Sequence, residues 1–519
     1  MIRASSWFRR LVALVCLGLG LAPTHAWLPH VVRKGNKLFY SDSGREFRMK
    51  GMAYYPRPNA GELAPVNNYD WASDDHEAVW APHLKVMQSI GVNTVRLYAV
   101  DPSKPHDKFM CAASQAGIYV LVGMAASCEN CAILDAKPPK CYPDALFTRA
   151  QMIYNAFAVY DNTLGFSVGN ENNLQNENGP GGSVTAPCVK AFLRDVRNYA
   201  SSCGSSMRQV PIGLDVADIP PRSQWLAYYD CVVDKNEFTR AEWLGFNPYV
   251  ECNPVDHTSY SQSAGLRAIM KDYADAAYSR PIMFGEFGCN AGANTVNGFE
   301  NQRAFRDAQW MNEEPEMTNE IVGGCVFEFS TEIANLKESK TLTKTKDAGK
   351  FGVGYFQPDA CDNNVTTCEF KPYPEFDNLK KAYLNTKKSN LTFAKYTPTR
   401  NQTLSCPAGM STDLPPMPNV KVLACSVAQP VCGGKKSNSF KKQAGKPMKM
   451  GQKSSPSNDP VETAHSNSGS NNGDGDDAND AGSNGNGKSA VRRSAGVAVV
   501  GSSASVLASA LVWIVLTVM

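Results

Sequence analysis

Two glutamates mark the places in this sequence where carboxylate chemistry is expected. Glu171 ends the largely apolar run LGFSVGNE, and Glu286 ends the run PIMFGE, about 115 residues further along the chain. Each run is typical of a buried β-strand that ends in a glutamate. Cleavage or transfer of a glycosidic bond needs one protonated and one ionised carboxyl group on opposite sides of the anomeric carbon. The pair therefore predicts glycosidic chemistry if the fold brings both strand ends together.

The two carboxyl groups are expected to have different roles. We interpret Glu171 as the general acid/base, which must hold a proton near neutral pH, so burial or the second carboxylate must raise its pKa. Glu286 is the expected nucleophile, ionised and directed at the anomeric carbon. Asn170, directly before the acid, can hydrogen-bond the sugar 2-hydroxyl, a contact that strengthens in the transition state.

Three residues at other strand ends extend the environment of the nucleophile. Arg96 can orient Glu286, and Tyr98 can hydrogen-bond to a sugar or stack on it. Tyr249 can donate a hydrogen bond to the Glu286 carboxylate and so keep it ionised. For each of these residues, a purely structural role as a satisfied polar group is the alternative.

Three more residues complete the set of candidates. Asp215 follows the fifth expected strand and is a candidate substrate contact, and Asn247 ends the sixth and is a candidate supporting residue. Tyr54 follows the first strand and is a candidate platform for a sugar ring. Packing in the core is an equally good interpretation of Tyr54.

The elements that must position these residues alternate along residues 27–397, which is the signature of a parallel α/β fold. Strands are expected at 47–54, 93–98, 118–122, 164–168, 210–214, 243–247, 282–286 and 324–329. Helices are expected at 76–90, 104–116, 144–160, 189–202, 261–278 and 298–311. Eight strands are what a closed (β/α)8 TIM barrel needs, and such a barrel collects its strand-end residues at one mouth. A hairpin of 37–40 with 47–49, turning at Asp42-Ser43-Gly44, is expected to close the other end.

Both ends of the chain carry processing patterns. Residues 1–26 have the basic flank and apolar run of a secretory signal peptide. Residues 398–432 form a proline-rich, cysteine-containing appendage, and 433–494 are a low-complexity stalk that is expected to be disordered. Residues 495–519 are almost wholly apolar or small and end the chain, as in a signal for attachment of a GPI lipid. A tail-anchored helix is the alternative.

Cysteine usage agrees with export. The chain has 16 cysteines, and 15 remain once Cys16 leaves with the signal peptide. This number suits an oxidising compartment, and because it is odd, at least one cysteine is unpaired or bonded between chains. Cys128 and Cys131 are spaced like zinc ligands, but no second such pair accompanies them, so we expect a local disulfide and no metal.

Charge and short motifs exclude several classes of function. The formal net charge of +3 includes six basic residues in the processed ends, so the mature protein is near −3. This argues against a nucleic-acid partner. There is no phosphate-binding loop and no dinucleotide fingerprint, so no cofactor is expected. Sequons at Asn364, Asn390 and Asn401 predict N-glycosylation.

Taken together, these segments resemble the fungal-type β-1,3-glucanosyltransferases of glycoside hydrolase family 72. The matching segments are FRMKGMAY (47–54), GVNTVRLYAVDP (91–102), AGIYV (116–120), GNE (169–171), FNPY (246–249) and FGEFGC (284–289). They occur in the family's order and cover about residues 27–395. A signal peptide and a GPI tail also fit that family.

The resemblance implies a reaction and several roles. It implies an enzyme that cuts inside a β-1,3-glucan donor chain, holds one part as an ester on Glu286, and passes it to the end of an acceptor glucan, with Glu171 as base. Such an enzyme elongates the glucan of the cell wall and is held at the outer face of the plasma membrane by its GPI lipid. The resemblance also implies a disulfide between Cys252 and Cys289.

The sequence also departs from the family pattern. The third strand is followed by Met124, where the family has an acidic residue, and Phe327 and Phe329 stand where the family has tyrosines. No cysteine of the mature chain precedes Cys111, although the family pairs this position with an earlier one. These differences leave two alternatives open: a retaining endo-β-glucan hydrolase on the same barrel, and a non-catalytic glucan-binding wall protein.

Overall fold

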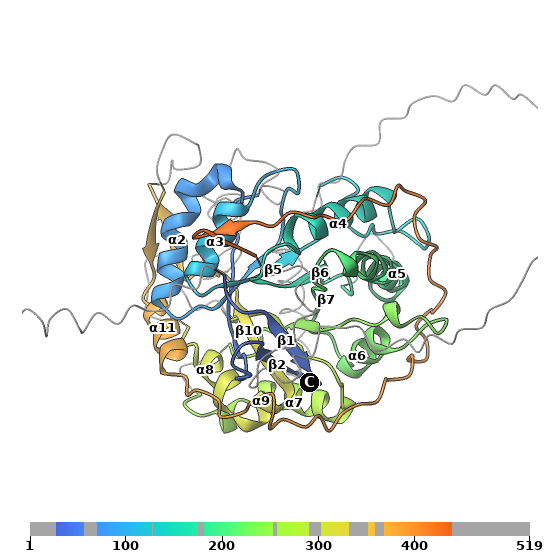
Figure 1. Cartoon of the computed structure of the whole chain (residues 1–519). Coiled ribbons are helices and arrows are strands. Elements are labelled where there is room, and N and C mark those ends of the chain that lie inside the picture. The colour runs from blue at the N-terminus through green and yellow to red at the C-terminus, as the bar shows by residue number, and fades with distance from the viewer. Residues whose placement is uncertain are drawn as a thin grey trace, which may run out of the picture.

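A closed barrel of eight parallel strands forms the centre of the molecule (Figure 1). In this computed structural model the described residues are 27–56, 70–126, 128–174, 181–252, 257–289, 303–331, 351–358 and 368–437. The strands are β3 (Met49–Ala53), β4 (Thr94–Leu97), β5 (Tyr119–Gly123), β6 (Thr163–Asn170), β7 (Ile212–Ala217), β8 (Leu244–Asn247), β9 (Ile282–Phe287) and β10 (Ile321–Val326). Each strand pairs with the next in sequence, and β10 pairs with β3 to close the ring. The predicted (β/α)8 barrel is confirmed.

Helices surround the strands on the outside (Figure 1). They are α2 (Glu77–Ser89), α3 (Asp107–Gln115), α4 (Asp144–Phe157), α5 (Gly181–Ser202), α6 (Arg222–Asp230), α7 (Ala264–Ala276), α8 (Arg306–Glu313), α9 (Pro315–Glu320) and α11 (Glu375–Asn385). Short 3-10 turns are η2 (Asp74–His76), η3 (Cys203–Ser205), η4 (Glu237–Thr239) and η5 (Tyr260–Gln262). The remaining described strands are β1 (Val31–Lys34), β2 (Lys37–Tyr40), β11 (Gly354–Gln357), β12 (Glu369–Pro372), β13 (Val431–Cys432) and β14 (Lys435–Lys436). The sequence did not predict α6, α9 or α11.

Alternation along each strand divides the core into two parts. Side chains of successive residues point to opposite faces of a strand. In β7, Ile212, Leu214 and Val216 pack in the large cluster with the helices, whereas Gly213 and Asp215 belong to the other face, inside the barrel. A second cluster, which includes Met49, Tyr119, Leu164 and Met283, fills the amino-terminal end of the barrel. The carboxyl-terminal end is therefore the open mouth.

The hairpin that covers the amino-terminal end differs from the prediction. The predicted partner of 37–40 was 47–49, but β2 pairs with β1, and only an isolated bridge joins Phe39 to Glu46. Gly35 turns the chain in the left-handed region at φ 59°, which permits a tight β1–β2 connection. Met49 is unavailable because it pairs in parallel with Gly323 of β10.

Residues 398–437 run around the outside of the barrel, and we call this segment the strap. In Figure 1 the strap is the orange trace that passes α9, α7, α6, α5 and α4 and ends beside α3. Three disulfides fasten it: Cys231–Cys406, Cys203–Cys425 and Cys111–Cys432. The expected appendage, 398–432, thus lies along the barrel surface, and Cys111 has a partner late in the chain rather than an earlier one.

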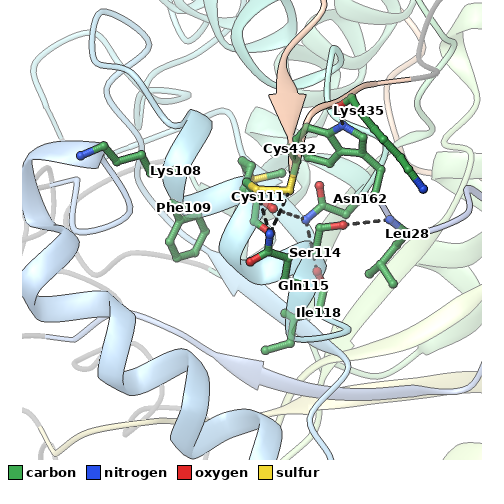
Figure 2. The surroundings of a disulfide bond; sticks show 12 residues. Leu28, Lys108, Phe109, Cys111, Ser114, Gln115, Ile118, Asn162, Cys432 and Lys435 are labelled. Carbon is green, nitrogen blue, oxygen red and sulfur yellow. Dashed lines mark hydrogen bonds between the residues drawn. A yellow bond between two sulfur atoms is a disulfide. The ribbon is translucent and has the colours of Figure 1, made fainter. Parts of the chain in front are cut away.

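The end of the strap meets the start of the described chain (Figure 2). Cys432 is bonded to Cys111 of α3, and the Leu28 backbone N–H donates to Ser114 Oγ at 2.8 Å on the same helix. The indole N–H of Trp27 donates to the Lys435 carbonyl at 2.9 Å. Because this region also contacts the residues just before β6, the strap ends toward the amino-terminal side of the barrel, away from the mouth.

Several predictions fall on residues that the structure does not describe. These are the signal peptide (1–26), the stalk from residue 438, the apolar tail (495–519) and Asn364. Asn390 and Asn401 are described and exposed. Within the described part of the chain, no helix combines the length and the apolar character that a membrane crossing requires.

Candidate active site

The two glutamates come from non-adjacent strands of the barrel and belong to one hydrogen-bond network at its mouth. Glu286 lies within β9 and is fully buried, and Glu171 directly follows β6 and is 9% exposed. A chain of hydrogen bonds connects them, from Glu286 through Arg96 and Asn170 to Asn247 and Glu171. The fold thus brings together the residues that the sequence proposed as the pair.

Three donors hold the carboxylate of Glu286. Arg96 Nη1 donates to Oε1 at 2.9 Å, and the Tyr98 hydroxyl donates to the same oxygen at 2.8 Å. The Tyr249 hydroxyl donates to Oε2 at 2.8 Å. A carboxylate can only accept hydrogen bonds when ionised, so this arrangement suits the charged form. It fixes the side chain in one orientation, as a nucleophile requires.

Both tyrosines remain donors over the whole working range of pH. Burial raises the pKa of Tyr98 well above its usual value, and the charge of Glu286 adds to the effect against the opposing charge of Arg96. Burial and then the charge of Glu286 likewise raise the pKa of Tyr249. Phe327 packs edge-on against both rings, with centroids 6.4 Å from each.

Glu171 has a different environment from Glu286. Its backbone is in the left-handed region at φ 55°, which is uncommon for a side chain of this kind, and its N–H donates to the Asp215 carbonyl at 3.0 Å. Asn247 Nδ2 donates to Oε1 at 2.9 Å, while Oε2 is buried without a hydrogen-bond partner in the described part of the chain. Burial first, and then the charge of Glu286, raises the pKa of Glu171 to about 8. Glu171 therefore carries a proton at neutral pH.

Asn170 connects the supporting side chains. Its Oδ1 accepts from Arg96 Nη2 at 2.9 Å and from Asn247 Nδ2 at 3.0 Å. Because the oxygen is occupied by these two donors, the amide nitrogen is the group that can face a sugar hydroxyl. The structure thus places Arg96, Asn170 and Asn247 in one network with both glutamates.

Tyr54 and Asp215, which were predicted to contact substrate, are buried in the core of the protein. Tyr54 is 1% exposed, and its hydroxyl hydrogen-bonds His83 Nδ1 at 2.9 Å, so it packs between β3 and the helices and forms no sugar platform. Its position follows from alternation, because Met52 and Tyr54 share the outer face of β3. Asp215 is fully buried beneath the mouth, where its carboxylate forms an ion pair with Arg96 at 3.0 Å. It contacts the site from below instead of contacting substrate.

Some residues of the site carried no signal in the sequence. Ser167 donates to Asp215 Oδ2 at 2.6 Å, and Gly245 and Gly285 make room for the same carboxylate. A serine in an apolar run is unremarkable until the partner strand is known. At the rim, by contrast, the disulfide Cys252–Cys289, which the family resemblance implied, is confirmed and joins the loops after β8 and β9.

The remaining cysteines include one disulfide that was predicted, one that was not, and one free thiol. Cys128 and Cys131 form the predicted local disulfide, and Cys141 pairs with Cys188. Among the cysteines that the structure describes, Cys325 is free and buried. It lies inside the barrel below Arg96, where burial raises the pKa of its thiol to about 12.

Comparison with known proteins gives one consistent result. Residues 22–370 match the family described as glucanosyltransferase. The chain is 31% identical over 354 residues to 1,3-beta-glucanosyltransferase gel1 of Aspergillus fumigatus, which covers 68% of this chain and 65% of that protein. It is 32% identical over 300 residues to 1,3-beta-glucanosyltransferase gas5 of Schizosaccharomyces pombe, covering 58% of this chain and 54% of the relative. The chain therefore spans 65% of the length of the first of these relatives and 54% of the second.

The fold has solved counterparts as well. Saccharomyces cerevisiae Gas2p in complex with laminaritriose and laminaritetraose superposes with a TM-score of 0.57 at 25% identity. The match covers 75% of this chain and 77% of that one. A structure of Gas2p with laminaripentaose matches with the same TM-score of 0.57.

Proposed function

Because the chain belongs to the glucanosyltransferase family, glycoside hydrolase family 72, we propose that it is a retaining β-1,3-glucan transglycosylase. One observation supports this most strongly: a protonated Glu171 and a carboxylate at Glu286 share one hydrogen-bond network at the barrel mouth. The relatives are named 1,3-beta-glucanosyltransferases, and the solved Gas2p structures hold laminari-oligosaccharides. These names support β-1,3-glucan as the donor and the acceptor.

In the first step an internal β-1,3 linkage is broken. A Glu286 carboxylate oxygen attacks the anomeric carbon and forms the glycosyl ester, while the glycosidic C–O bond breaks. Glu171 gives its proton to the departing oxygen, which leaves as the hydroxyl of the released chain. Arg96, Tyr98 and Tyr249 hold the nucleophile in place throughout.

In the second step the ester is passed on. The ionised Glu171 takes the proton of an acceptor hydroxyl as that oxygen attacks the anomeric carbon, and the ester bond to Glu286 breaks. The new glycosidic bond has the configuration of the old one, since two inversions have occurred. Water in place of the acceptor would give hydrolysis. The site therefore transfers when a sugar hydroxyl reaches the ester before water does.

We extend the proposal to the location of the protein. The disulfides of the described domain require an oxidising compartment. Together with the processing patterns at both ends, they support a secreted enzyme that a GPI lipid holds at the outer face of the plasma membrane, where it elongates cell-wall glucan. In this proposal 1–26 is removed, 27–397 is the catalytic domain, and 438–494 is the stalk before the replaced tail. Residues 433–437, which were expected to belong to the stalk, are part of the strap, where β13 pairs with β14. The exposed Asn390 and Asn401 are accessible for glycosylation.

The test is an incubation of the mature domain with a reduced laminari-oligosaccharide, followed by sizing of the products. Products longer than the donor are expected. Glu286→Gln and Glu171→Gln should both abolish them, whereas Glu316→Gln, at an exposed glutamate of α9, should not. Only shorter products would indicate a hydrolase, and binding without turnover would indicate a wall-binding protein.

A further inference from the structure

Beneath the two glutamates lies a third carboxyl group whose surroundings are built to hold it. Asp215 is fully buried inside the barrel, where an ionised side chain is costly without partners. Arg96 Nη2 lies 3.0 Å from Oδ2, and Ser167 Oγ donates to the same oxygen at 2.6 Å. Its other oxygen, Oδ1, has no hydrogen-bond partner in the described part of the chain. The carboxylate is thus held on one side by a cation and a hydroxyl.

Two glycines of the neighbouring strands create the space for this carboxylate. A Cβ at Gly245 of β8 would lie 2.0 Å from Asp215 Oδ1, and a Cβ at Gly285 of β9 would lie 2.2 Å from it. Any other residue at either position would collide with the side chain. Three strands are therefore adapted to one fully buried acid.

Arg96 is the link between this acid and the reacting groups. The Arg96 guanidinium forms an ion pair with Glu286 through Nη1 and with Asp215 through Nη2. Nη2 also donates a hydrogen bond to Asn170. The Asp215 carbonyl in addition accepts the N–H of Glu171 at 3.0 Å. Asp215 thus acts on both glutamates without contacting either carboxyl group.

We propose that Asp215 is a positioning residue that shares the charge of Arg96, so that Glu286 remains a reactive nucleophile and Glu171 keeps its proton; this inference rests on the proposed function. Without the negative charge at position 215, the guanidinium charge is directed at Glu286 alone. That carboxylate then becomes a weaker nucleophile, because its electron pairs are held more tightly. The negative charge of Asp215 also opposes ionisation of Glu171.

The charged and titratable groups that face Glu171 come from several strands. They are Glu286 of β9, Arg96 of β4, Asp215 of β7, and Tyr249 after β8. Cys325 of β10 and Tyr98 after β4 face Arg96. Among these groups, the charge of Asp215 can be removed by a substitution that leaves both Glu286 and its three hydrogen-bond donors unchanged.

The experiment measures the pH dependence of kcat and KM for a reduced laminari-oligosaccharide. Asp215→Asn removes the charge and keeps the shape. We expect its kcat to fall about 10-fold with KM within about 2-fold of wild type, because the residue does not touch substrate. The alkaline limb of its kcat profile should move to lower pH by roughly half a unit to one unit, since Glu171 loses its proton more easily.

Two further variants separate charge from structure. Asp215→Ser is smaller, fits between the glycines and should shift the alkaline limb in the same direction. Ser167→Ala removes a hydrogen bond but leaves the carboxylate beside Arg96, so its limb should move much less than that of Asp215→Asn. A profile of Asp215→Asn that coincides with wild type would overturn the inference, as would an equal shift in Ser167→Ala. Absence of any glucan product from the wild-type enzyme would instead refute the proposed function itself.

Discussion

Replacing Glu171 by glutamine is expected to stabilise the fold at alkaline pH while it abolishes transfer. Burial first, and then the charge of Glu286, raises the pKa of Glu171 from its ordinary value of 4.5 to about 8. A group whose folded-state pKa is higher than its unfolded one binds its proton more tightly in the native state. Between these two pKa values the unfolded chain has released the proton and the native protein still holds it, so stability falls as pH rises.

The magnitude follows from the size of the shift. Each unit of pKa difference corresponds to about 1.4 kcal/mol. From pH 5 to pH 8, Glu171 should therefore cost the wild type on the order of 3 kcal/mol of unfolding free energy. Glutamine does not titrate. The free energy of unfolding of Glu171→Gln, relative to that of the wild type, should therefore increase by this amount between pH 5 and pH 8. For a domain of this size the gain corresponds to roughly 3–6 °C in the unfolding midpoint.

The assay is thermal unfolding of wild type and variant in matched buffers from pH 5 to pH 8, with disulfides intact. Glu316→Gln, at an exposed glutamate of α9, serves as the control for the replacement of a glutamate by glutamine. A constant difference between Glu171→Gln and wild type across this range would show that Glu171 is already ionised in the native state. That result would remove the acid from the proposed mechanism.

Three further results are expected. The wild-type kcat/KM profile for a laminari-oligosaccharide should fall on the alkaline side near pH 8, where Glu171 loses its proton, and a profile still flat at pH 9.5 would contradict this. Tyr249→Phe should lower kcat roughly 10- to 100-fold, since one hydrogen-bond donor to the Glu286 carboxylate is lost. The control is Tyr273→Phe, which removes a buried hydroxyl that has no hydrogen-bond partner in the described part of the chain and should retain activity. Cys432→Ser should lower the unfolding free energy by about 2.5 kcal/mol more than Cys128→Ser. The Cys141–Cys188 and Cys203–Cys425 bonds leave Cys111–Cys432 an effective loop on the order of 50 residues, against a separation of 3 for Cys128–Cys131. Equal denaturation midpoints for those two variants would contradict that estimate.

The strands could be predicted because buried parallel strands consist of nearly continuous apolar runs. All eight predicted runs overlap a strand of the barrel, and the two that end in glutamate meet at the mouth. The helices α6, α9 and α11 were missed because each is short or rich in polar residues. Their stability comes from packing on the barrel, which propensity alone does not reveal.

The direction of side chains was harder to predict than the strands themselves. Asp215 was assigned to a strand end because the predicted strand stopped at residue 214, whereas β7 continues to Ala217. Alternation of Ile212, Leu214 and Val216 on the helix side places Asp215 inside the barrel. The same argument places Tyr54 on the outer face. The alternating pattern along the strand predicts the face on which each of these two side chains lies, but it does not predict which residues they contact.

Disulfide partners depend on proximity that only the folded chain creates. The strap cysteines bond to residues 175 to 321 positions away, and no spacing rule connects them. The sequence departs from the family resemblance in having no earlier cysteine to pair with Cys111, and the fold supplies Cys432 as its partner. The missing early cysteine is thus replaced by a late one that secures the strap.

The assignment of acid and nucleophile follows from a balance of charge across the whole site. One arginine, Arg96, faces three buried carboxyl groups, and it pairs directly with Glu286 and Asp215. If Glu171 were also ionised, three negative charges would share one positive charge among largely buried side chains, which is strongly unfavourable. The proton must therefore remain on the carboxyl group that lacks a contact with the guanidinium. In the proposed mechanism Glu171 is the acid because Arg96 already pairs with the other two carboxylates. A substitution that frees Arg96 from one of them should therefore change the pKa of Glu171 without altering that residue.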